Sequence, residues 1–143
     1  MRVIIMRGLP GGGKSFKANQ IKEHLIKEGY TVAYCSNDDY PEYYNNPEGV
    51  YDWSEEKVKK AIKYCEAEFD AAIAAKKDII IVDNTHITHK SYSYYKEGAE
   101  RAGYEVSFNV IKPTKEALPI YAKRNKHKVH MGILTRMFRS WQD

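Results

Sequence analysis

A glycine-rich stretch between two regular patterns carries the clearest chemistry in the sequence. Residues 8–15 read GLPGGGKS, after the apolar run 3–6 and before a segment with helical spacing. Glycines let backbone N–H groups approach an anion closely, and a following helix N-terminus directs its dipole at the same place. Lys14 would then reach the β- and γ-phosphates of a nucleoside triphosphate, and the Ser15 hydroxyl would bind Mg²⁺. The pattern predicts a P-loop rather than a plain glycine-rich turn. The residues assigned to nucleotide binding are Gly8, Pro10, Gly11, Gly12, Gly13, Lys14, Ser15 and Phe16.

Acidic residues follow two further predicted strands. Asp38 comes after residues 31–35, and Asp83 comes after residues 78–82. In open parallel sheets ligands bind beyond the carboxyl ends of the strands, so both acids are expected near the P-loop. Asp38 is the candidate general base for an acceptor hydroxyl, with an Asx-turn as the alternative. Asp83 would orient Mg²⁺ or else cap the next helix, and Thr85 would donate to a phosphate, an acceptor or only the turn.

Cations and aromatic rings gather in two other segments. Residues 123–130 form the densest cationic patch, and a lid over a transferring phosphate requires such charges. Arg124 is the candidate lid residue there, whereas for each single lysine a solvated helix end is the favoured interpretation. The loop 36–53 is rich in aromatic residues, which stack unpaired bases or cover a sheet edge. These aromatic residues are Tyr40, Tyr43, Tyr44, Tyr51 and Trp53.

The remaining pattern alternates strands with helices. We expect strands at 2–7, 31–35, 78–82 and 104–112, and helices at 14–28, 52–76, 90–102, 115–125 and 133–141. Asp52 and Glu55 have the spacing of a capping box for the second helix, and the fourth should be interrupted or bent near Pro119. Such alternation predicts an α/β protein with a parallel sheet covered by helices on both faces.

Composition restricts the class of protein. A chain of 143 residues with 43% hydrophobic and 29% charged residues predicts a single globular domain over 1–143. The net charge of +4 favours an anionic partner only weakly. Cys35 and Cys65 have no metal-site spacing and are expected to be buried reduced thiols. No stretch is long enough to span a membrane, and we expect a cytoplasmic protein. The sequence indicates no oligomeric state.

In this order the motifs resemble the P-loop kinase domain of phage-type polynucleotide 5′-hydroxyl kinases and the related kinase-like domains of NEDD4-binding proteins. The resemblance covers essentially the whole chain and rests on residues 7–15, 37–40, 83–86, 123–125 and 133–141. It implies a three-layer α/β P-loop kinase fold. The four parallel strands would have the order 2-3-1-4, and a C-terminal helical lid would follow.

The resemblance also implies roles for individual residues. Asp38 would be the general base on a 5′-hydroxyl, and Arg124 would be a lid cation. Lys128 aligns with a second lid arginine, Pro41 replaces an arginine, and Asn84 aligns with the family's third-strand acid. The residues placed on the acceptor side are Asp38, Tyr40, Thr85 and His86.

Together these features predict an ATP- and Mg²⁺-dependent kinase that phosphorylates the 5′-OH of DNA or RNA. Two alternatives stay open at this point. One is a kinase for a nucleoside, a sugar or an antibiotic. The other is a non-catalytic ATP-binding adaptor.

Overall fold

The sheet has four parallel strands, which are the centre of the fold. The computed structural model describes residues 1–43, 54–125 and 129–143. The strands are β1 (Arg2–Arg7), β2 (Val32–Cys35), β3 (Ile79–Asp83) and β4 (Glu105–Val110). They are ordered β2-β3-β1-β4, and each neighbouring pair is parallel. This confirms the α/β class and the predicted order 2-3-1-4.

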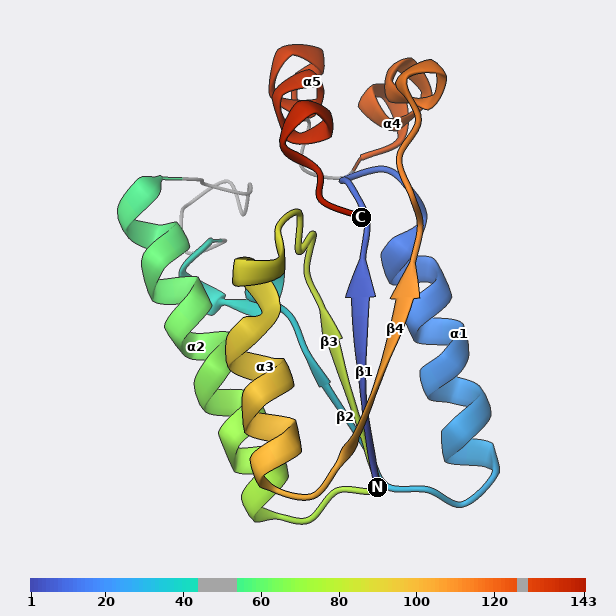
Figure 1. The fold of residues 1–143 in the computed structure, drawn as a ribbon, viewed down its shortest axis with the longest axis vertical. Helices are drawn as coiled ribbons and strands as arrows, with labels where there is room; N and C mark the ends of the chain where they lie inside the picture. The colour runs from blue at the N-terminus through green and yellow to red at the C-terminus, as the bar shows by residue number, and fades with distance from the viewer. Residues whose placement is uncertain (44–53, 126–128) are drawn as a thin grey trace.

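Helices cover both faces of this sheet (Figure 1). Helix α1 (Lys14–Lys27) lies on one face, whereas α2 (Glu55–Ala74) and α3 (His89–Arg101) lie on the other. Side chains alternate along each strand, so the two faces have separate cores. Met6 and Ile81 pack under α1, and Ile5 and Val82 pack under α2 and α3. Every residue of β3 is buried, as expected for a central strand of a parallel sheet.

Side-chain caps start two of these helices. The Ser54 hydroxyl accepts a hydrogen bond from the Lys57 N–H at the start of α2, and Thr88 does the same for Ser91 in α3. The predicted start at Asp52 was therefore wrong, because Ser54 supplies the N-cap that an N-terminal helical turn requires. Asp52 itself lies outside the described residues.

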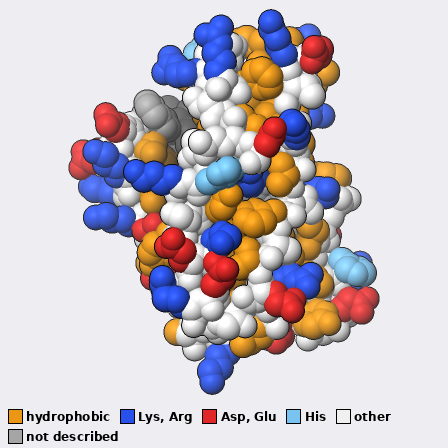
Figure 2. All heavy atoms as spheres, viewed as in Figure 1, with side chains coloured by type: hydrophobic (Ala, Val, Ile, Leu, Met, Phe, Trp, Pro, Cys, Tyr) orange, Lys and Arg blue, Asp and Glu red, His pale blue; other side chains and the backbone are white. Residues whose placement is uncertain are grey.

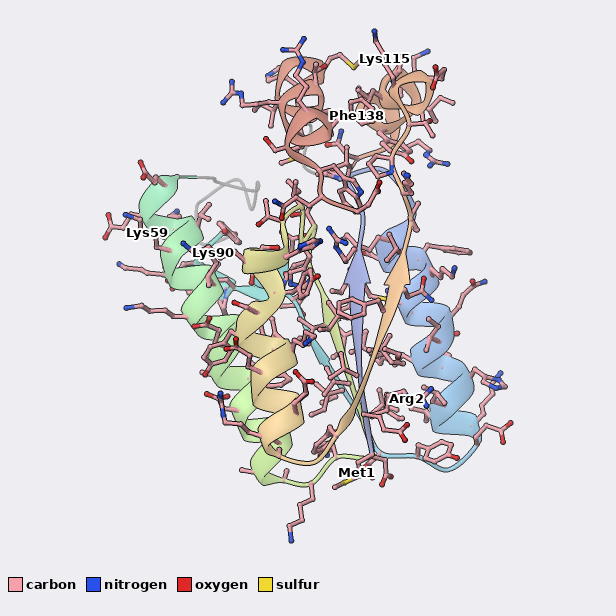
Figure 3. All side chains as sticks on the ribbon, viewed as in Figure 1. Met1, Arg2, Lys59, Lys90, Lys115 and Phe138 are labelled. Atoms are coloured by element: carbon pink, nitrogen blue, oxygen red, sulfur yellow. The ribbon has the colours of Figure 1, made fainter. Side chains whose placement is uncertain are left out.

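A small helical cap lies above the carboxyl ends of the strands (Figure 1). It consists of a 3₁₀ turn (Lys115–Ala117), α4 (Leu118–Arg124) and α5 (Met131–Ser140). The interruption predicted near Pro119 within 115–125 is confirmed, because the 3₁₀ turn precedes α4 and Pro119 lies in the first turn of α4, where no N–H is required. Figure 3 shows Lys115 and Phe138 in the cap, at the opposite end of the molecule from Met1 and Arg2.

The cap is joined to the P-loop by its own apolar cluster. Leu9, Leu118, Tyr121 and Leu134 are all buried together. Because Leu9 belongs to residues 8–15, the position of the cap and the conformation of the P-loop are coupled through packing.

Two further expectations concern the described residues. Cys35 and Cys65 are both free and buried, as predicted. No helix in the described part of the chain is both long and apolar enough to cross a membrane.

Candidate active site

Three loops meet at one edge of the sheet. The P-loop follows β1, the segment from Ser36 follows β2, and the segment from Asn84 follows β3. Because the strands are parallel, their carboxyl ends bring these loops together beneath the cap (Figure 1). The three loops predicted to carry candidate residues therefore meet at one edge of the sheet.

Lys14, Ser15 and Asp83 form a contiguous cluster there. The Lys14 ammonium lies 3.0 Å from Oδ1 of Asp83, and the Ser15 hydroxyl donates to Oδ2 at 2.8 Å. Asp83 is 1% exposed and Lys14 is 8% exposed. Asp83 ends β3 with its side chain on the α1 side, which is where the first turn of α1 places Lys14 and Ser15.

Tyr34 completes the cluster, although the sequence analysis assigned it no role. Its hydroxyl donates to Oδ2 of Asp83, the oxygen that Ser15 also contacts. Burial, followed by the negative charge of Asp83, raises the pKa of Tyr34 well above its usual range, so the phenol keeps its proton. No sequence motif marks Tyr34, because its place depends on the strand register, which pairs Tyr34 with Ile81, two residues before Asp83.

A side chain of the cap is hydrogen-bonded to the backbone of the P-loop. Arg124 donates from Nε and Nη2 to the Gly11 carbonyl, at 3.1 and 2.8 Å. Gly11 has a φ of 83°, and a Cβ built there would lie 2.3 Å from the Tyr121 carbonyl oxygen. Glycine is required at this position by both the conformation and the close approach of α4.

The loop after β2 is tied to the loop after β3. Residues Asn37–Asp39 form one 3₁₀ turn, in which the Ser36 hydroxyl accepts the Asp38 N–H at 3.2 Å. The Asn84 side-chain oxygen accepts the Asn37 N–H at 2.8 Å. Asp38 is half-buried, as a base that must meet a substrate requires. Desolvation, then the charges of Asp38 and Asp83, raises the pKa of Asp39.

His86 lies beneath this edge instead of lining it. It is 3% exposed, its Nδ1 lies 2.8 Å from the Met6 carbonyl, and its Nε2 lies 3.4 Å from the Asn84 amide nitrogen. A carbonyl only accepts and this amide nitrogen only donates, so the ring is neutral with the proton on Nδ1. Burial lowers the pKa of His86 to about 4. The acceptor-binding role predicted for His86 does not fit this geometry, because no ring nitrogen is free.

Arg7 is a second residue without an assigned role in the sequence analysis. Its guanidinium donates to the carbonyls of His86 at 2.8 Å, Ile87 at 3.1 Å and Gln142 at 2.6 Å. The rings of Tyr92 and Trp141 lie 5.2 and 4.5 Å from Cζ, within cation–π range. Arg7 therefore fixes the β3–α3 loop and the chain after α5 to the end of β1.

The other predicted residues differ in their surroundings. Thr85 is half-buried, and its carbonyl accepts the Gly8 N–H at 3.0 Å. Phe16 is 71% exposed on α1. Tyr40 packs its ring against Tyr43, which is 2% exposed, so Tyr43 has no free face for a base. Four predicted residues lie outside the described residues: Tyr44, Tyr51, Trp53 and Lys128.

The donor set fits Mg²⁺ better than a metal held by the protein alone. No group of three or more His, Cys, Asp or Glu side chains gathers as a metal site within residues 1–43, 54–125 and 129–143. Ser15 and Asp83 instead place two hard oxygen ligands 2.8 Å apart beside the P-loop. Mg²⁺ characteristically takes one or two such groups and completes its shell with phosphate and water.

Comparison with known proteins places this site in a family. Residues 1–130 match the family described as chromatin associated protein KTI12. The chain belongs to the KTI12 family. It is also 29% identical to human NEDD4-binding protein 2 over 146 residues, which cover 98% of this chain and 8% of that protein. This relative supports the resemblance to NEDD4-binding proteins, whereas the resemblance to phage polynucleotide kinases stays a prediction.

Solved structures share the fold of this KTI12 family member. Kti12 of Chaetomium thermophilum, in complex with ADP-AlF3, superposes with a TM-score of 0.66 and 16% identity over 99% of this chain and 80% of that one. A chain of the Pnkp1/Rnl/Hen1 RNA repair complex gives 0.62 and 17% identity over 97% and 43%. Mycobacterium tuberculosis APS kinase CysC, in complex with AMPPNP and APS, gives 0.57 and 14% identity over 80% and 65%. At these identities the likeness shows a P-loop kinase fold.

Proposed function

We propose that this protein is an ATP- and Mg²⁺-dependent kinase whose acceptor is the 5′-hydroxyl end of a nucleic acid. The observation that carries the proposal is the meeting of Lys14, Ser15 and Asp83 beside the loop that holds Asp38. A protein that only binds nucleotide needs the first three groups, whereas transfer to an alcohol also needs a base. The Kti12 and APS kinase structures named above contain nucleotides or their analogues, in agreement with such a site.

Each side chain would have a defined task in this reaction. The Lys14 ammonium would leave the Asp83 carboxylate and bind the β- and γ-phosphates. There it would stabilise the charge that develops during transfer. Ser15 and Asp83 would hold Mg²⁺, which supplies further neutralisation of phosphate charge. Asp38 would accept the proton of the attacking hydroxyl while the bond from the γ-phosphorus to the β–γ bridging oxygen breaks. Arg124 would bring a cation from the cap to the same phosphates.

Charge distribution favours an anionic acceptor. Of the 23 lysines and arginines, eight lie from residue 112 onward, together with only two of the 19 acids. Figure 2 shows several Lys and Arg side chains over the cap, which Figure 1 places above the carboxyl ends of the strands. A basic surface beside the acceptor site is what a phosphate backbone requires. The likeness to a chain from an RNA repair complex agrees with this choice.

The test uses γ-labelled ATP with a panel of acceptors. The panel contains a 5′-OH DNA oligomer, the matching RNA, a 3′-nucleotide, small nucleosides and water. Asp38→Asn should reduce labelling of an oligomer by roughly 10²–10⁴-fold with ATP affinity intact. Asp39→Asn is the matched control, because it removes the adjacent carboxylate and should cost far less. If only the small nucleosides were labelled, the acceptor would be a small molecule and not a nucleic acid.

A second candidate is a non-catalytic ATP-binding adaptor. The family description, chromatin associated protein, names an association and no reaction. Tight ATP binding without label on any acceptor, unchanged in Asp38→Asn, would favour this candidate. A single domain over 1–143 and a cytoplasmic location are further expectations, which limited proteolysis and fractionation would test.

A further inference from the structure

The strand register explains how Tyr34 reaches the site. Tyr34 in β2 pairs with Ile81 in β3, so both side chains lie on the face covered by α1. Asp83 lies two residues after Ile81 and therefore on the same face, one step nearer the P-loop. A tyrosine is long enough to span this step, and its hydroxyl donates to Oδ2 of Asp83. A shorter side chain at position 34 would leave that contact unmade.

The phenol ring is held in place along its length. It packs against the buried cluster that contains Met6, Ala18 and Ile81. The Lys22 ammonium, from α1, lies 5.6 Å from the ring centroid. The ring is fixed on one side by the sheet and on the other by α1, so the hydroxyl meets Asp83 with little loss of rotamer freedom.

The hydrogen-bond donors to Asp83 differ in the other contacts that the proposed reaction requires of them. Among the described residues, Lys14, Ser15 and Tyr34 donate to this carboxylate. In the proposed reaction Lys14 turns to the phosphates and Ser15 turns to Mg²⁺, which removes two of the three hydrogen bonds. Tyr34 has no competing task. It can keep its hydrogen bond while the surroundings of a carboxylate that is 1% exposed change.

We propose that Tyr34 is a positioning residue, which orients the carboxylate of Asp83 for the metal that accompanies the nucleotide. The role rests on the proposed function, because it needs Asp83 to organise Mg²⁺. A phenol that holds Oδ2 of this buried carboxylate fixes its orientation and keeps that oxygen beside the Ser15 hydroxyl, where the metal would bind. Groups that orient metal ligands in this way characteristically contribute about 10- to 100-fold to metal affinity or activity.

The decisive variant is Tyr34→Phe, which removes one hydroxyl and keeps the ring in the core. Tyr94→Phe is the matched control, since the Tyr94 hydroxyl donates to Oδ2 of Asp70 at 2.5 Å between α3 and α2, away from the P-loop. Binding of a fluorescent ADP analogue is titrated with Mg²⁺ for each protein. We expect the half-saturating Mg²⁺ concentration to rise about tenfold in Tyr34→Phe and to stay at the wild-type value in Tyr94→Phe.

A double-mutant cycle separates positioning from general stabilisation. Asp83→Asn should raise the Mg²⁺ requirement by itself, and adding Tyr34→Phe should then cost less than twofold more, since the two residues act through one contact. An unchanged Mg²⁺ requirement in Tyr34→Phe overturns the inference. So does a lowered melting temperature with the wild-type Mg²⁺ requirement, which marks a structural hydroxyl. Absence of Mg²⁺-dependent binding by the wild type overturns the proposed function itself, and with it this role.

Discussion

The Nζ atom of Lys14 lies 3.0 Å from Oδ1 of Asp83, and the two side chains are 9% and 1% exposed. A buried pair of this kind is not primarily a source of stability, because the cost of removing both charges from water offsets their attraction. In the proposed function both partners have tasks in phosphoryl transfer. The pair compensates both charges within the fold, and it would place Lys14 beside the phosphates and Asp83 beside their metal.

Replacing the lysine tests this assignment. Lys14→Ala should slow phosphoryl transfer by about 10²-fold or more, because charge developing on the phosphates would lose its closest cation. The measurement is single-turnover labelling at saturating ATP. Lys17→Ala is the control, since Lys17 is an exposed lysine one helical turn away, and its rate should match the wild type. A loss below threefold in Lys14→Ala would remove the residue from the mechanism.

The P-loop glycines offer a second matched comparison. Gly11 and Gly13 both have positive φ, of 83° and 87°, so alanine at either site costs about 1 kcal/mol or more of backbone strain. A Cβ at Gly11 would also meet the Tyr121 carbonyl oxygen at 2.3 Å, whereas one at Gly13 meets nothing within 4 Å. Gly11→Ala should therefore lower the free energy of unfolding by about 3 kcal/mol or more. Equal losses in the two variants, measured by denaturant unfolding, would show that the cap moves without cost.

Arg7 and Arg2 both lie in β1, but replacement by methionine should lower the free energy of unfolding at Arg7 alone. Arg7→Met leaves three carbonyls without their donor and removes a buried guanidinium from between two rings, so it should lower the free energy of unfolding by about 3 kcal/mol. Arg2→Met breaks only the exposed pair with Glu105 and should leave stability nearly unchanged. Urea unfolding of both variants measures the two free energies of unfolding. A stable Arg7→Met protein would mean that the β3–α3 loop holds its position without the guanidinium.

The P-loop and the strand-end acids could be predicted because both depend on local patterns. A GxxxxGKS stretch after an apolar run predicts a P-loop by itself, and short apolar or β-branched runs place Asp38 and Asp83 after predicted strands. The strand order came from the family resemblance, since periodicity by itself does not order strands. Helix starts were less certain because several residues near a helix can cap it, and here Ser54 does so instead of Asp52.

Contacts between distant segments could not be predicted from the sequence. Tyr34 reaches Asp83 only because β2 and β3 pair in one particular register. Arg7 satisfies carbonyls from two loops whose approach is set by the packing of the cap, and no sequence motif encodes that approach. His86 looked accessible because it follows a strand end, but its φ of 47° turns the chain and its ring lies under the sheet edge.

The buried His86 predicts a loss of stability in acid. Its pKa falls from 6.5 to about 4 on folding, chiefly because burial disfavours the charged ring; the Met6 carbonyl and Asp83 act against this decrease, and Lys14 and Arg7 add to it. The unfolded chain therefore binds more protons between these values, so the contribution of His86 is complete above about pH 6.5 and disappears as pH falls toward 4. The full shift corresponds to about 3 kcal/mol.

Comparing the wild type with His86→Asn isolates the pH-dependent contribution of His86 to stability. Asparagine is chosen because it tolerates the positive φ at this position. Unfolding free energies are measured in urea at pH 7 and at pH 4. Carboxylates titrate in both proteins and cancel in the difference, so the wild type should lose about 3 kcal/mol more than the variant. Parallel losses would mean that His86 is protonated within the folded protein, with its hydrogen bonds rearranged.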